Sequence, residues 1–143
     1  MANEVLVGDQ LSQEMIDAGV SLIRALDSFK SKLTVAAAFW LLFPEAGAWR
    51  LVVAAREVSK DGPKAAYSRI RMATRLVPPD DFVVATKDIA VAELKAPLVQ
   101  LLASAIHTGP GIAGVRFTRN TINGQYIPDA YIYRLHLRPN GAG

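Results

Sequence analysis

The sequence predicts one α+β domain spanning residues 1–143, with three helices and a mostly antiparallel sheet of about five strands. The length of 143 residues suits a single domain, and 51% hydrophobic side chains supply enough apolar surface for a core. Apolar residues recur at helical spacing in three segments and alternate or run unbroken in the others. Gly, Pro and Asn separate these segments, and no linker or internal repeat divides the chain. The resulting element order is α-β-β-α-β-α-β-β.

The first element is an amphipathic helix over residues 9–30. Its apolar residues lie three or four positions apart: Leu11, Met15, Ala18, Leu22, Leu26 and Phe29. Asp9 or Ser12 is the expected N-cap, because either side chain can accept a hydrogen bond from a backbone N–H of the first turn.

A β-hairpin follows, with strands over 33–43 and 48–58 and a turn at 44–47. The first strand is apolar on both faces, which is typical of a strand at the centre of a sheet. We expect the helices to pack on one face of this sheet, so the other apolar face needs a different cover.

The second helix opens at Pro63 and ends before Pro78-Pro79, because a residue that precedes proline avoids helical angles. Residues 81–93 contain two short extended pieces. A third helix covers about 97–106.

The last two strands cover 115–119 and 131–138, and Asn123-Gly124 between them is a strong hairpin-turn signal. Alternation divides the final strand into two faces: Tyr131, Tyr133, Leu135 and Leu137 on one, and Ile132, Arg134, His136 and Arg138 on the other. The tail from 139 to 143 is expected to fray.

Composition excludes several classes of function. The chain contains no cysteine, which excludes disulfide frameworks, thiolate metal sites and thiol nucleophiles. The first residues do not resemble an export signal, and the longest apolar run, 33–43, is about half the length of a membrane span. We therefore expect a soluble cytoplasmic protein without a membrane partner.

Charge is distributed in blocks along the chain. Residues 1–30 carry five acidic and two basic side chains, whereas 50–75 carry seven basic and two acidic ones. On the second helix, Lys64, Arg71 and Arg75 lie opposite the apolar stripe. Further candidates for this basic surface are Arg50 and Arg56, extended by Arg116, Arg119, Arg134 and Arg138 if the last hairpin is adjacent. Such a surface suits an anionic partner, since arginine recognises carboxylate and phosphate through paired hydrogen bonds.

One short sequence pattern indicates an alternative function, which is catalytic. Pro79-Asp80, followed by Glu93-Leu94-Lys95, resembles the PD…(D/E)xK motif of magnesium-dependent restriction-endonuclease-like nucleases. The resemblance covers residues 79–100. It implies that Asp80 (or Asp81) and Glu93 hold Mg²⁺ and that Lys95 stabilises developing charge. The competing interpretation is that Asp80 and Asp81 are turn residues and that Glu93 and Lys95 are surface charges.

The chain has two histidines, which the sequence places in different settings. His107 lies near the end of the third helix, where a cation is favoured by the helix dipole. His136 alternates with Arg134 and Arg138 and is expected to be exposed on the sheet.

The favoured interpretation is a non-catalytic interaction or regulatory module, without a cofactor, that binds a protein or an acidic partner. Aromatic clusters around both hairpins and the sheet face left without helices favour self-association as a homodimer. The alternatives are the Mg²⁺-dependent nuclease and non-catalytic nucleic-acid binding through the basic surface.

Overall fold

A computed structural model describes residues 3–28 and 32–137 and shows an α+β fold built on a five-stranded sheet. The strand order is β5-β3-β2-β7-β6, and within this sheet only the β3–β5 pair is parallel. Its strands are β2 (Val35–Phe43), β3 (Ala48–Ala55), β5 (Ile89–Ala92), β6 (Val115–Ile122) and β7 (Gln125–Leu135). The predicted class and the mostly antiparallel sheet are confirmed.

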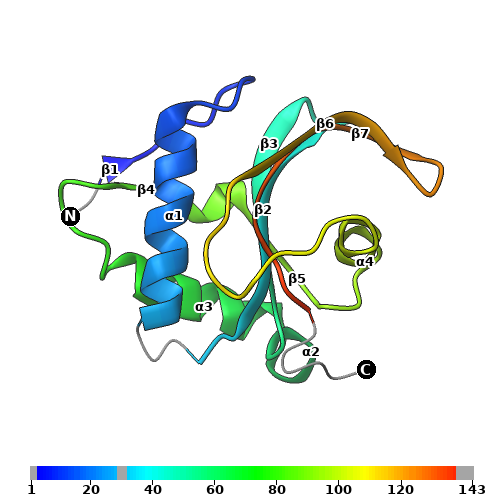
Figure 1. The fold of residues 1–143 in the computed structure, drawn as a ribbon. Coiled ribbons are helices and arrows are strands. Elements are labelled where there is room, and N and C mark those ends of the chain that lie inside the picture. The colour runs from blue at the N-terminus through cyan, green and yellow to red at the C-terminus, as the bar shows by residue number, and fades with distance from the viewer. Residues whose placement is uncertain (1–2, 29–31, 138–143) are drawn as a thin grey trace.

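The remaining elements are helical or form a small second sheet. The helices are α1 (Gln13–Ser28), α2 (Val58–Asp61), α3 (Pro63–Thr74) and α4 (Pro97–Ala103), with the 3₁₀ turn η1 (Thr86–Asp88) before β5. The short strands β1 (Asn3–Glu4) and β4 (Phe82–Val83) pair in parallel beside α1 (Figure 1).

The first helix and the hairpin follow the sequence closely. The Ser12 hydroxyl accepts a hydrogen bond from the Met15 N–H at 3.1 Å, so Ser12 is the cap and α1 begins at Gln13. Strand β2 is central, as its two apolar faces indicate. Strand β3 ends at Ala55, three residues before the predicted end at Val58. Just after the strand, the Glu57 carboxylate accepts hydrogen bonds from the backbone N–H and the hydroxyl of Thr34.

The prediction that all helices pack on one face of the sheet is wrong. Figure 1 shows α1 and α3 on one side and α4 on the other. The sheet therefore separates two hydrophobic clusters, one beneath α1 and α3 and one beneath α4. Because β2 is apolar on both faces, the chain must cover both, and it does so with its own elements.

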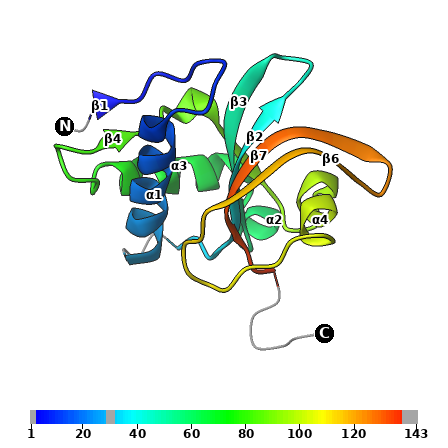
Figure 2. The ribbon, with the colours of Figure 1, turned by 45° about the horizontal axis from the view of Figure 1, so that its top comes forward.

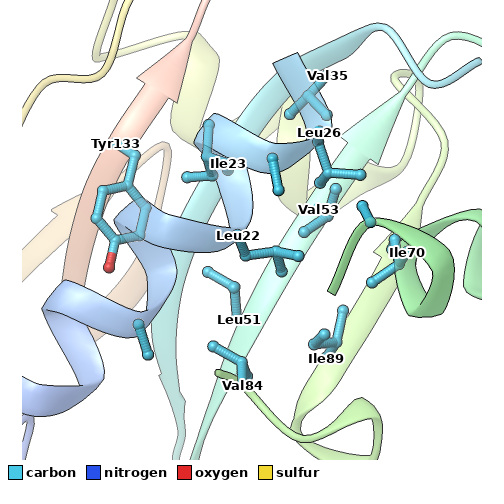
Figure 3. Packing of buried hydrophobic residues seen from close by; sticks show 14 of the residues in the cluster. Leu22, Ile23, Leu26, Val35, Leu51, Val53, Ile70, Val84, Ile89 and Tyr133 are labelled. Carbon is cyan, nitrogen blue, oxygen red and sulfur yellow. The ribbon is translucent and has the colours of Figure 1, made fainter. Parts of the chain in front are cut away.

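The larger cluster lies between the sheet and the α1–α3 layer (Figure 3). Leu22 and Leu26 of α1 lie beside Leu51 and Val53 of β3, and Ile23 lies toward Tyr133 of β7. Ile70 of α3 lies on the other side of this cluster and is fully buried. The three-and-four spacing of apolar residues on both helices accounts for this layer.

The smaller cluster lies between the sheet and α4. Val99 and Leu102 of α4 pack with Phe39, Val52 and Ile132 of the sheet. Figure 2 shows the β6–β7 hairpin arching beside α4. The hairpin turns at Asn123 and Gly124 with φ of 49° and 82°, the two positive values that a two-residue turn of this kind requires.

The predicted alternation along the last strand is wrong beyond Tyr133. The pairing of β7 with β2 passes from Phe39–Ile132 to Ala38–Arg134, so one extra residue of β7 bulges there. Tyr133 consequently packs in the α1–α3 cluster, whereas Leu135 belongs to the α4 cluster. Expectations for Phe29, Arg138 and the tail at 139–143 fall outside the described residues.

Candidate functional site

Three basic side chains form a continuous line along the solvent side of α3, and we call Lys64, Arg71 and Arg75 the basic stripe. They lie within about 40° of one another around the helix axis and span about 16 Å along it. All three are exposed, because Ala66, Ile70 and Ala73 fix the opposite side of the helix in the core. None of the three forms an ion pair with any described residue, whereas the neighbouring Arg69 is paired with Asp61 at 2.9 Å.

Two half-exposed apolar side chains flank the stripe. Met72 is 52% exposed and Leu76 is 49% exposed, and each follows an arginine of the stripe by one residue. Exposed methionine and leucine beside arginine give this surface both charge and apolar area, a combination found at protein interfaces.

The other predicted basic residues do not all extend the stripe. Arg50 alternates with Trp49 and Leu51, which face the α1–α3 cluster, so Arg50 lies on the opposite face of the sheet from α3. Its guanidinium donates a hydrogen bond to the Lys87 carbonyl at 3.2 Å. Arg56 is exposed in the turn between β3 and α2.

The expected contribution of Arg134 to a basic surface is wrong. Arg134 is 4% exposed, and its guanidinium donates two hydrogen bonds to the Asp27 carboxylate, at 3.1 and 2.6 Å. It also donates to the carbonyl oxygens of Val35 and Gly111. Arg134 thus joins α1, β2 and the loop before β6 to the end of β7, and four of its five N–H donors are used in these structural contacts.

Arg116 is likewise engaged within the protein. It forms a two-bond pair with the Asp129 carboxylate at 2.7 and 2.6 Å, and its guanidinium lies 6.0 Å from the centre of the Trp49 ring. The hydrogen bond to Asp129 raises the pKa of Arg116 above its ordinary value. Of Arg116, Arg119 and Arg134, the three predicted extensions that lie in the described ranges, Arg119 is the one that is exposed and forms no ion pair there.

The residues of the nuclease-like pattern lie on separate parts of the fold. Asp80 is in the turn before β4, which belongs to the small sheet, whereas Glu93 and Lys95 follow β5 of the large sheet. The neighbouring Asp81 carboxylate accepts a hydrogen bond from the Ser21 hydroxyl of α1 at 3.2 Å. Within residues 3–28 and 32–137, no group of three or more His, Asp or Glu side chains is placed to hold a metal ion.

A groove of about 690 Å³ opens between the end of α4 and the end of β7. Its apolar lining is Leu94, Ala103, Leu135 and Leu137, and its polar lining is Gln100, Ser104, His107, Thr108 and His136. The volume is in the range of small-molecule sites. The lining residues carry no carboxylate and no lysine or arginine.

The groove brings together the two histidines that the sequence places in different settings. Thr108 forms backbone and side-chain hydrogen bonds to Leu135, and this pairing sets His107 beside His136. His136 Nδ1 lies 3.2 Å from the Thr108 carbonyl oxygen, and because a carbonyl only accepts, Nδ1 is the donor in this contact. No spacing along the chain signals this meeting, because 28 residues separate the paired segments.

Comparisons of the chain with protein-family models, with curated proteins and with solved structures found no match. None of the helices in the described ranges has both the length and the apolar character needed to cross a bilayer. The basic stripe on α3 and the groove beside α4 are thus defined by geometry and chemistry alone.

Proposed function

We propose that this protein is a non-catalytic interaction module, and that the basic stripe on α3 binds an acidic surface of a protein partner. The observation that carries the proposal is that three neighbouring cationic side chains along α3, Lys64, Arg71 and Arg75, form no ion pair with any described residue. Their fixed spacing favours a partner with several carboxylates, and the charges would accelerate and orient the encounter.

Because both faces of the sheet are covered, a different surface supports the proposed binding from the one that the sequence suggested. An uncovered apolar face no longer supports docking, because α1, α3 and α4 cover the sheet from both sides. Support now comes from the outer surface of the α1–α3 layer. We expect this binding to take place in the cytoplasm, and a chain free of cysteine is compatible with that location.

A protein partner suits the surface better than a nucleic acid. Met72 and Leu76 add apolar contact area beside the charges, and protein interfaces bury such area. A phosphate backbone would use the positive charges but would leave both apolar side chains without a partner.

The test compares two double charge reversals by fluorescence anisotropy with a labelled peptide of ten glutamates in 50 mM salt. Arg71→Glu with Arg75→Glu should weaken binding at least tenfold. Lys87→Glu with Lys95→Glu makes the same change in net charge outside α3 and should weaken binding by less than threefold. Equal losses in the two variants would contradict the proposal, and so would tighter binding of a 20-base-pair DNA duplex than of the peptide at the same salt.

A further inference from the structure

The layer that carries the basic stripe also carries an acidic surface. Glu14 and Asp17 are exposed on the outer side of α1, in its first two turns. Neither forms an ion pair in the part of the chain that the structure describes, although Asp17 accepts a hydrogen bond from Gln13 at 2.8 Å. We call Glu14 and Asp17 the acidic patch.

The acidic patch and the basic stripe do not neutralise each other within one molecule. Arg69 of α3 donates a hydrogen bond to the carbonyl oxygen of Lys32, which follows the C-terminal end of α1. Helix α3 therefore lies beside the end of α1 that is opposite to the acidic patch (Figure 1). The α1–α3 layer thus presents two surfaces of opposite sign that form no ion pairs among the described residues.

We infer that the acidic partner of the basic stripe is a second copy of this chain, an inference that rests on the proposed function. In a two-fold dimer, the acidic patch of each copy would meet the basic stripe of the other, so both unpaired surfaces would be satisfied twice. Charge complementarity of the two surfaces selects the second copy over an unrelated protein, because the same molecule supplies both signs at fixed positions.

The chemistry predicts a dimer of modest affinity that is sensitive to salt. Exposed ion pairs each contribute little and are screened by added ions. The apolar side chains of Met72 and Leu76 would be covered in the same contact. We therefore expect the dimer dissociation constant to rise at least tenfold between 50 and 500 mM salt.

A charge exchange tests the inference by sedimentation velocity on the full chain. In one variant Glu14→Lys and Asp17→Lys reverse the acidic patch; in the other Arg71→Glu and Arg75→Glu reverse the basic stripe. Each variant alone should be monomeric in 50 mM salt, because like charges then face each other. An equimolar mixture should form a heterodimer, since the reversed patch of one variant complements the reversed stripe of the other.

Several results would overturn the inference. The first is that the wild type is monomeric at 500 µM in 50 mM salt. The second is that either variant alone remains a dimer. The third is that the mixture stays monomeric although circular dichroism shows that both variants are folded. The Lys87→Glu, Lys95→Glu variant should dimerise like the wild type. A monomeric wild type that still binds the glutamate peptide through α3 would overturn the second copy and leave the proposed function standing; loss of both would overturn both.

Discussion

The two faces of the sheet are covered in different ways. The α1–α3 face buries a large cluster that includes Trp40, Trp49 and Tyr133, and its outer surface carries opposite charges. The α4 face is covered by one seven-residue helix and a curved hairpin, and it keeps a groove of about 690 Å³. The charged surface thus lies over the larger buried cluster, whereas the described lining of the groove contains no carboxylate, lysine or arginine.

A buried hydrogen-bond network holds α1 against the sheet. The Tyr133 hydroxyl donates to the Ile16 carbonyl at 2.7 Å and accepts from the Trp40 indole N–H at 3.0 Å. The indole also donates to the Met15 carbonyl at 3.2 Å. Two carbonyls of α1 are thereby held against β2 and β7, which fixes the helix on the sheet.

The largest expected effect tests whether both faces are true cores. Leu22 on the α1 side and Leu102 on the α4 side are both buried, so each Leu→Ala change should lower the free energy of unfolding by about 3 kcal/mol. Leu6→Ala, at a side chain that is 90% exposed, is the control and should cost little. Urea unfolding followed by tryptophan fluorescence measures all three. If Leu102→Ala lowers the free energy of unfolding no more than Leu6→Ala does, α4 does not cover the second face of the sheet.

A smaller effect tests the close approach of α1 to the sheet. A Cβ atom at Gly19 would overlap the Tyr133 hydroxyl oxygen, so Gly19→Ala must displace a ring held by two hydrogen bonds. We expect a loss of about 2 kcal/mol in unfolding free energy, despite the better helix propensity of alanine. Gly109→Ala, which meets nothing within 4 Å, is the matched control. Equal stability of the two variants would show that α1 shifts freely on the sheet.

The smallest expected effect is a loss of folding stability at alkaline pH. Burial raises the pKa of the Tyr133 phenol well above its ordinary value, outweighing the opposite effect of the hydrogen bond from Trp40. Below about pH 10 the phenol is protonated in both folded and unfolded chains. Above it, only the unfolded chain loses the proton, so stability falls with rising pH, by at most about 1.4 kcal/mol per pH unit.

Tyr133→Phe should remove this part of the alkaline fall. Tyr126→Phe, at a ring that is 59% exposed, should retain it. The measurement is the urea midpoint between pH 9 and 11 for the two variants and the wild type. Parallel curves for all three would contradict a buried, protonated Tyr133.

Much of the fold follows from local signals in the sequence. The spacing of apolar residues identifies α1, Pro63 marks the start of α3, and Asn123-Gly124 marks the last hairpin. The apolar character of β2 on both faces places it at the centre of the sheet. These features depend on a few neighbouring residues, so one sequence is enough to predict them.

The features that sequence analysis misses depend on contacts between distant segments. The bulge near Tyr133 arises from the register with β2, and a register is set by the partner strand. Arg134 is buried because Asp27, 107 residues earlier, supplies its counter-charge. The exposed placement of Lys64, Arg71 and Arg75 opposite the buried side of α3 follows from the helical period alone, whereas their role in binding stays a prediction.

The most direct test of the account is a titration of the ¹⁵N-labelled protein with the ten-glutamate peptide in 50 mM salt, followed by amide chemical shifts. We predict that the largest chemical-shift changes fall on residues 64–76 and that the amide shifts around His107 and His136 do not change. Shifts concentrated at the groove beside α4, or near Arg50, would contradict the claim that the α1–α3 layer is the binding surface.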